Sequence, residues 1–133
     1  MTPKLYTVED ANQALPEVRR LVSRIVEIMP TLPEMHEAVR IAELKSKRPG
    51  AGESEEERLA QSVASLRSAE MAVAVALRSL EAMNVTLKDS TSGLVDFLGE
   101  RDGEVVELCW RMGEDRVASW HRIGDGYPGR QPL

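Results

Sequence analysis

Residues Ser54–Met83, SEEERLAQSVASLRSAEMAVAVALRSLEAM, contain neither proline nor glycine. Ser54 and Glu57 form a capping-box sequence at the start of this stretch, and Asn84 suits the left-handed conformation that often ends a helix. Between these signals apolar residues recur at spacings of four and three, with one gap of seven, namely Leu59, Val63, Leu66, Val73, Leu77 and Leu80. The stretch therefore predicts one helix, about 45 Å long at about 1.5 Å per residue, with a continuous apolar stripe.

The middle of this predicted helix is apolar on almost every side. From Ala69 to Leu77 apolar residues also occur away from the stripe, namely Met71, Ala72, Ala74 and Val75. One neighbouring helix and a small sheet cannot cover such a surface, and a long exposed apolar stripe promotes association. We therefore expect a homodimer with a four-helix interface, formed through Val73, Leu77 and their neighbours.

The N-terminal region is expected to hold a lead-in and a short first helix. Met1–Tyr6 is predicted to be extended, and Thr7 with Asp10 has the sequence of a helix cap. Pro16 lacks an amide hydrogen and disfavours helical geometry at the residue before it, so the first helix is expected to end there. Pro16 can then open the next helix.

A second long helix is predicted after Pro16, because apolar residues keep the same spacing. Pro30 and Pro33 interrupt it, and Thr31 begins another capping-box sequence, so we expect a break or kink near Pro30. Lys47–Glu53 is the loop that turns the chain back into an antiparallel hairpin. The apolar stripe of this helix consists of Leu15, Val18, Val22, Ile25, Met29, Leu32, His36 and Val39, which makes His36 a core or interface histidine.

The last third of the chain changes to the alternating pattern of β-strands. Asp102-Gly103 is a hairpin turn signal. Along Glu104–Met112, the even-numbered residues Val106, Leu108, Trp110 and Met112 are expected to face one side, and Val105, Glu107, Cys109 and Arg111 the other. The other predicted strands are Val85–Lys88, Leu94–Leu98 and Val117–Arg122.

These patterns together predict an α+β fold. A long antiparallel helical hairpin with a short N-terminal helix is followed by a small antiparallel β-meander of three to four strands. Residues 1–133 are expected to form a single domain, with 7–83 as the helical part and 84–133 as the meander and C-terminal tail.

Composition narrows the classes of protein and partner. The net charge of −5 and pI of about 5.1 argue against a nucleic-acid-binding protein, which needs a clustered basic surface. The single cysteine excludes an internal disulfide and fits a reducing compartment. No segment has the length and apolar character of a signal peptide or membrane span, so we expect a cytoplasmic protein without a membrane partner.

Several strings near the two ends of the chain resemble one family. In order they are YTVEDANQALP (Tyr6–Pro16), GLVDF (Gly93–Phe97), LCWRMGE (Leu108–Glu114), WH (Trp120–His121) and GRQPL (Gly129–Leu133). They resemble the domain-of-unknown-function 2203 family of small bacterial proteins. The resemblance implies no activity, because none is established for that family. Leu98 stands where the family usually has proline, and Arg122 where an acid commonly follows Trp-His, which weakens any proposal that an adjacent acid tunes His121.

Cys109 and His121 are the residues whose chemistry first suggests catalysis or metal binding. On adjacent strands they could form a nucleophile and base, or two metal ligands. No third orienting group is apparent, and the two histidines are far apart without a metal-binding motif, so no metal and no cofactor are expected. Cys109 is interpreted as a buried structural residue. Gly124–Gly129 fits G-x-G-x-x-G but lacks the following helix that a dinucleotide site requires.

A local concentration of aromatic and charged residues is the remaining candidate site. Its members are Trp110, Arg111, Glu114, Trp120, His121, Tyr127 and Arg130. Such residues could close a small core, form a protein interface or line a ligand pocket. The tail from Gly124 is expected to be docked, with Arg130 reaching an acid near the Gly113–Glu114 turn and Tyr127 lying against Trp120 or Trp110.

Two functional hypotheses follow from these observations. The first is a non-enzymatic, self-associating cytoplasmic protein with an interaction surface on the C-terminal meander. The alternative is a small-molecule-binding protein or enzyme that uses the Trp/His/Arg cluster. The sequence names no ligand, protein partner or pathway for either hypothesis.

Overall fold

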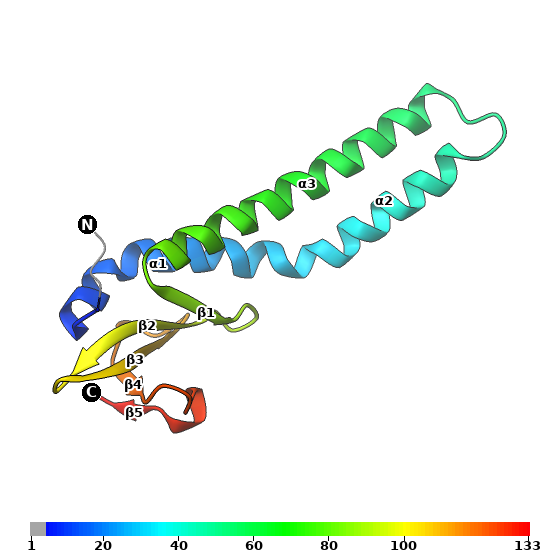
Figure 1. The fold of residues 1–133 in the computed structure, drawn as a ribbon. Coiled ribbons are helices and arrows are strands. Elements are labelled where there is room, and N and C mark those ends of the chain that lie inside the picture. Colours follow the sequence, from blue (N-terminus) through cyan, green and yellow to red (C-terminus); the bar gives the residue numbers. More distant parts are fainter. Residues whose placement is uncertain (1–4) are drawn as a thin grey trace.

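A computed structural model describes residues 5–133, so most of the predicted Met1–Tyr6 lead-in lies outside the described part (Figure 1). A helical region is followed by an antiparallel sheet, as predicted. The helical elements are α1 (Val8–Ile28), the 3₁₀ turn η1 (Met29–Thr31), α2 (Leu32–Ser46) and α3 (Glu53–Ala82). The remaining elements are β1 (Val85–Asp89), β2 (Leu94–Arg101), β3 (Glu104–Arg111), β4 (Ser119–His121), the 3₁₀ turn η2 (Tyr127–Gly129) and β5 (Gln131–Pro132).

Within the described residues the sheet has five strands in the order β1-β2-β3-β4-β5, one more than the largest predicted number. The extra strand comes from the tail, where no strand was predicted. Ser119 pairs with Pro132 and Trp120 with Gln131, and the Leu133 amide donates to the Ala118 carbonyl at 3.0 Å. A two-residue strand among glycines and prolines shows no alternation of apolar and polar residues, so the sequence pattern does not predict it.

Helix α1 forms the centre of the core. Thr7 and Asp10 form the predicted capping box. The helix packs against α3 and against the sheet, and its buried residues are Ala11, Leu15, Val18, Leu21, Val22 and Ile25. Pro16 lies inside this helix, so the prediction that it ends the first helix is wrong. Pro16 is exposed while Leu15 and Val18 are buried, and burying its neighbours in one continuous helix outweighs a cost of about 3 kcal/mol for an internal proline.

The predicted break near Pro30 is present as η1, between α1 and α2. The predicted capping box at Thr31 is wrong, because Thr31 is itself helical and its hydroxyl donates to the Ile28 carbonyl at 2.6 Å. Helix α3 begins at Glu53 after Gly52, without the side-chain cap expected from Ser54 and Glu57.

Two further predictions concern α3, namely the conformation of the residue that follows it and the set of residues that it buries. Asn84 has the predicted left-handed conformation, with φ of 58°. The buried face of α3 consists of Leu66, Val73, Ala76 and Leu80, so Ala76 replaces the predicted Leu77 on that face.

Helix α2 and residues 53–67 of α3 project away from the sheet as a two-helix arm (Figure 1). We call this unit the helical arm. The sheet does not extend along it, and the only residues of the described arm that are buried are Ala42 and Leu66. The arm is therefore stabilised by one narrow seam between its two helices.

Gly99 lies where the backbone of the N-terminal segment, at Tyr6, pairs with the sheet. The Tyr6 amide donates to the Leu98 carbonyl at 2.9 Å, and the Glu100 amide donates to the Tyr6 carbonyl at 3.0 Å. A Cβ atom on Gly99 would lie 2.7 Å from the Tyr6 carbonyl oxygen and 2.9 Å from Cγ of Leu108. Only glycine fits at this crossing without a shift of the backbone.

Replacing Gly99 by alanine is expected to lower the free energy of unfolding by about 1–3 kcal/mol, because the added methyl group overpacks a backbone crossing. Thermal or chemical denaturation measures the loss. Gly52→Ala is the control, since its Cβ would meet no atom within 4 Å, and its cost should stay below about 1 kcal/mol. Equal stability of the Gly99→Ala variant and the natural protein would contradict this packing.

Candidate functional site

The sheet has an inner face toward α1 and an outer face on which the polar candidate residues lie. Along β3, Val106, Leu108 and Trp110 are fully buried on the inner face, as the alternation predicted. Glu107 and Cys109 lie on the outer face. The outer face is where the structure brings the candidate functional residues together.

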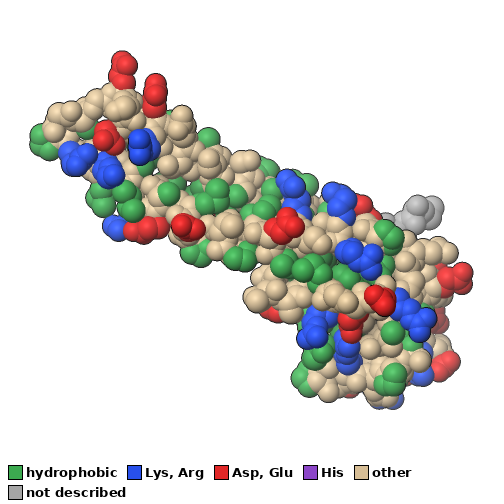
Figure 2. Space-filling model, turned by 180° about the vertical axis from the view of Figure 1, so that it is seen from behind, with side chains coloured by type: hydrophobic (Ala, Val, Ile, Leu, Met, Phe, Trp, Pro, Cys, Tyr) green, Lys and Arg blue, Asp and Glu red, His purple; other side chains and the backbone are tan. Residues whose placement is uncertain are grey.

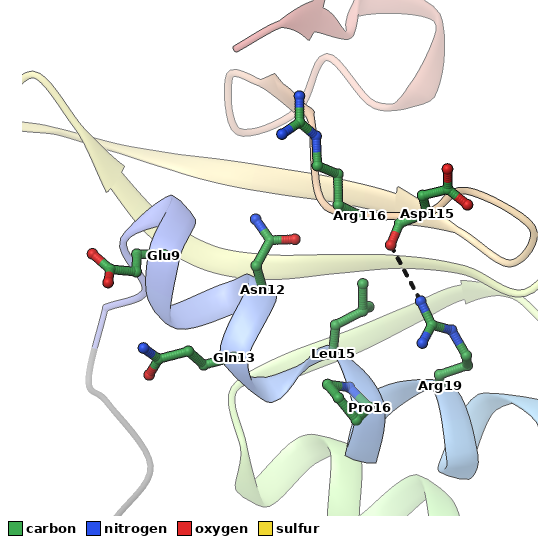
Figure 3. Close-up of a pocket in the computed structure, with 8 residues that line it drawn as sticks. All are labelled: Glu9, Asn12, Gln13, Leu15, Pro16, Arg19, Asp115 and Arg116. Atoms are coloured by element: carbon green, nitrogen blue, oxygen red, sulfur yellow. Dashed lines mark hydrogen bonds between the residues drawn. The ribbon is translucent and has the colours of Figure 1, made fainter.

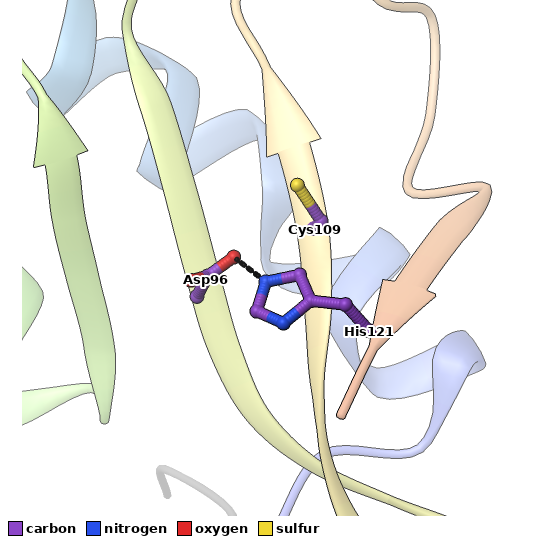
Figure 4. A group of neighbouring side chains, drawn as sticks. All are labelled: Asp96, Cys109 and His121. Carbon is purple, nitrogen blue, oxygen red and sulfur yellow. Dashed lines mark hydrogen bonds and ion pairs between the residues drawn. The ribbon is translucent and has the colours of Figure 1, made fainter. Parts of the chain in front are cut away.

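Three adjacent strands each contribute one side chain to a buried polar cluster on this face (Figure 4). Asp96 on β2 is directly opposite Cys109 on β3, and His121 on β4 lies beside them. Their exposed fractions are 2%, 1% and 1%. One candidate ligand atom from each of the three side chains lies within 4.8 Å of the other two. We call these residues the Asp-Cys-His cluster.

Two hydrogen bonds fix the imidazole of His121. Its Nδ1 lies 2.9 Å from the Arg122 carbonyl oxygen, and its Nε2 lies 3.0 Å from Oδ1 of Asp96. A carbonyl can only accept, so Nδ1 carries a hydrogen. Burial lowers the pKa of His121, but the hydrogen bonds to Arg122 and Asp96 and the negative charges of Asp96 and Glu107 outweigh it and raise that pKa above its usual value. His121 and Asp96 therefore form a buried, hydrogen-bonded pair.

Cys109 does not have the surroundings of a catalytic nucleophile. Burial raises the pKa of its thiol to about 11, although Nη1 of Arg130 lies 3.8 Å from Sγ and acts in the opposite direction. Both nitrogens of His121 are engaged by Asp96 and Arg122, so the imidazole is not placed to deprotonate the thiol.

Sequence reasoning missed Asp96, the third member of the cluster. No third group was apparent beside Cys109 and His121 in the sequence, but the structure supplies an acid from β2 rather than from the position after His121. The signal was the polar residue in the alternation of Leu94–Leu98, combined with the register of the Asp102-Gly103 hairpin, which sets Asp96 opposite Cys109.

A second group of side chains holds the tail on the outer face. Arg130 forms an ion pair with Glu114, with Nη1 at 3.3 Å from Oε1, which confirms the predicted contact. Tyr127 lies 4.6 Å from the Arg130 guanidinium and 5.6 Å from that of Arg111. The prediction that Tyr127 packs against a tryptophan is wrong, because η2 places it beside these arginines while Trp110 is buried on the inner face.

The two tryptophans of the predicted cluster belong to the core. Trp110 is fully buried, and its Nε1 donates to the Glu114 carbonyl at 3.0 Å. Trp120 lies between Arg101 and Arg122, at 4.4 Å and 5.4 Å from their guanidinium carbons. Its Nε1 is buried and has no hydrogen-bond partner among the described residues. The tryptophans therefore close the inner core rather than line an open pocket.

A separate hollow of about 650 Å³ lies between the start of α1 and the segment before β4 (Figure 3). Oδ1 of Asn12 accepts from the Val117 amide at 2.8 Å, and its Nδ2 donates to the Val8 carbonyl at 3.0 Å. Arg19 donates to the Asp115 carbonyl at 3.4 Å. The bonds to Val117 and Asp115 attach α1 to the segment before β4. None of the residues lining this hollow belongs to the predicted aromatic and charged cluster.

The fold and the site define an α+β protein with a projecting two-helix arm and a buried Asp-Cys-His cluster on a five-stranded sheet. The chain belongs to the family described as "Uncharacterized conserved protein (DUF2203)", whose sequence model matches residues 4–133. No curated protein and no solved structure matches the chain. None of the helices within residues 5–133 is both long and apolar enough to cross a membrane.

Arg130→Gln is expected to lower the free energy of unfolding by about 1–2 kcal/mol at neutral pH, because it removes a half-buried, charge-assisted pair. Burial raises the pKa of Glu114, but its hydrogen bonds to Arg130 and the Arg111 amide lower it overall below 4.5. The stabilisation is therefore complete above that value and is lost as the pH falls through the lowered pKa. Denaturation measured across this range should show the two proteins converging in acid.

Arg20→Gln is the matched control for this prediction, since Arg20 pairs with Glu17 on the exposed surface of α1. Its effect on stability should be clearly smaller than that of Arg130→Gln. A difference between Arg130→Gln and the natural protein that stays constant down to the acid limit would contradict the role given to Glu114.

Cys109 is expected to react slowly with a thiol reagent at neutral pH in the chelator-treated native protein. The thiol is buried and its pKa of about 11 leaves very little thiolate. The rate should rise by orders of magnitude when the protein is unfolded in denaturant. Because Cys109 is the single cysteine, the modified fraction reports on it alone. Fast labelling of the folded protein would overturn the structural interpretation of this residue.

Proposed function

We propose that this protein is a non-enzymatic, self-associating cytoplasmic protein in which the helical arm and the adjoining part of α3 pair with a second copy. The observation that carries the proposal is the exposure of large apolar side chains on α3. Met71 is 60%, Val75 49% and Leu77 40% exposed. Exposed apolar residues concentrated on one helix mark an interaction surface.

Met71 and Val75 border a groove between α1 and α3. One part of it has a volume of about 400 Å³ and is lined by Leu21, Met71, Ala72, Val75 and Ala76, with Arg20 and Arg24 among its polar residues. A second part of about 490 Å³ shares Arg24, Ser68 and Ala72 with the first and extends toward the arm. Figure 2 shows apolar side chains running along the helices from the arm toward the sheet. The small residues of α3 would let another helix approach closely.

A second copy is the occupant that this surface suits best. The apolar ridge of Met71 and Val75 and the groove lie on the same part of the same helices, so a two-fold axis can seat each ridge against the partner's groove. The arm also needs cover along its length, because its seam buries so little. An antiparallel four-helix arrangement supplies that cover.

The structure changes which residues this interface can use. Val73 is only 7% exposed and belongs to the chain's own core, so Val73→Glu would unfold the protein rather than test the dimer. Leu77 remains accessible. The outer face of the sheet, with Arg111 and Tyr127, is the proposed second interaction surface. The alternative of a ligand-binding or catalytic Trp/His/Arg cluster is not favoured, because its tryptophans lie in the core and both His121 nitrogens are engaged.

The double variant Met71→Glu/Val75→Glu is expected to be a monomer, because both substitutions place charge on the proposed interface. Sedimentation equilibrium at micromolar concentration should give the natural protein twice the 14.8 kDa mass of the chain and the double variant the single mass. Helicity measured by circular dichroism shows whether the variant is folded.

Thr91→Glu is the control for added charge, since Thr91 is an exposed residue in the turn between β1 and β2. It should remain a dimer. A natural protein that sediments as a monomer, or a folded double variant that still dimerises, would contradict the proposal.

A further inference from the structure

We propose that Asp96, Cys109 and His121 bind one zinc ion at the centre of the sheet, on its outer face. The site is independent of self-association and does not depend on the proposed interface. It is built from one residue on each of β2, β3 and β4. All three residues are buried, with exposed fractions of 2%, 1% and 1%.

The spacing of the donor atoms suits a tetrahedral ion. Nε2 of His121 and Oδ1 of Asp96 are 3.0 Å apart, and the donor atoms of all three residues lie within 4.8 Å. Zinc bonds of about 2.0–2.3 Å place neighbouring ligand atoms roughly 3.3–3.8 Å apart. Small rotations of the side chains in Figure 4 therefore suffice to form the site.

The surrounding hydrogen bonds match those of zinc ligands. Zinc-bound histidines commonly donate their second ring nitrogen to a backbone carbonyl, and Nδ1 of His121 does so to Arg122. The guanidinium of Arg130, held by Glu114, lies 3.8 Å from Sγ of Cys109 and can donate to a thiolate ligand. The orientation of His121 and Cys109 is thus fixed by Arg122 and Arg130, which would not themselves coordinate the zinc ion.

The three ligands can balance the charge of the ion. Zinc carries two positive charges, and a carboxylate from Asp96 and a thiolate from Cys109 supply two negative charges, while a neutral imidazole completes the set. The bound ion would therefore leave no net charge on this ligand set in the interior.

An acidic hollow of about 220 Å³ borders the cluster at Asp96. Asp96 itself lines it, together with the carboxylates of Glu81 and Glu107, and with Thr86 and Leu98. Glu107 pairs in register with His121. Three acids around one hollow attract cations and leave room for the fourth ligand that a three-residue zinc site needs. The thiol and imidazole select zinc over calcium and magnesium, which prefer oxygen ligands throughout.

Titration of the reduced, chelator-treated full chain with cobalt(II), the spectroscopic substitute for zinc, tests the proposal. One equivalent should produce a thiolate-to-metal charge-transfer band in the near ultraviolet together with the intense visible bands of a tetrahedral site, and one equivalent of zinc should abolish both. Cys109→Ser should lose the charge-transfer band. His121→Gln should bind at least about 100-fold more weakly, since losing an outer-shell partner alone costs 10–100-fold.

His36→Gln is the matched control, because His36 is the only other histidine and lies exposed beside Glu70. It should bind cobalt as the natural protein does. Zinc should also raise the melting temperature of the natural protein and slow alkylation of Cys109, which tests the site even if a ligand variant fails to fold. No charge-transfer band at stoichiometric cobalt, a band that survives in Cys109→Ser, or equal losses in His36→Gln and His121→Gln would overturn the proposal.

Discussion

The rest of the structure depends on the burial of α1 between α3 and the sheet. Its six buried side chains join the two layers into one core with Val73, Ala76 and Leu80 of α3 and with the inner face of the strands. At roughly 1.5–3 kcal/mol for each large apolar side chain, this burial dominates the other contacts described here. It also explains why Pro16 is accommodated. Beyond η1 the helices extend away from the sheet, so no comparable layer packs against the helical arm.

Periodicity predicted the parts of the fold that are set by burial. It identified the helical hairpin and the alternation along β3, while the local preferences of proline and asparagine identified the break at Pro30 and the left-handed Asn84. It failed where tertiary contacts outweigh a local preference, as at Pro16, and where a cap sequence was left unused, as at Ser54. The strand β5 was missed because its pairing with β4 depends on a partner distant in the chain rather than on its own pattern.

The site was less predictable than the fold for a related reason. The pairing of Arg130 with Glu114 followed from charge and the turn position, but Asp96, Cys109 and His121 carry no spacing motif. They meet only because the register of three strands places them in neighbouring rows on one face. That register also turns the tryptophan side chains to the inner face and leaves Tyr127 and Arg130 on the outer face, so one predicted cluster is divided between a core and an outer face.

Hydrogen exchange in α2, measured as a function of protein concentration, tests the central claim that the arm requires a second copy. α2 is the most informative element, because Ala42 is its only buried residue in the described chain. The account predicts slow exchange of the α2 amides at high concentration and much faster exchange after dilution, while α1 stays protected throughout. Exchange in α2 that is slow and independent of concentration would contradict it, since the arm would then be stable alone.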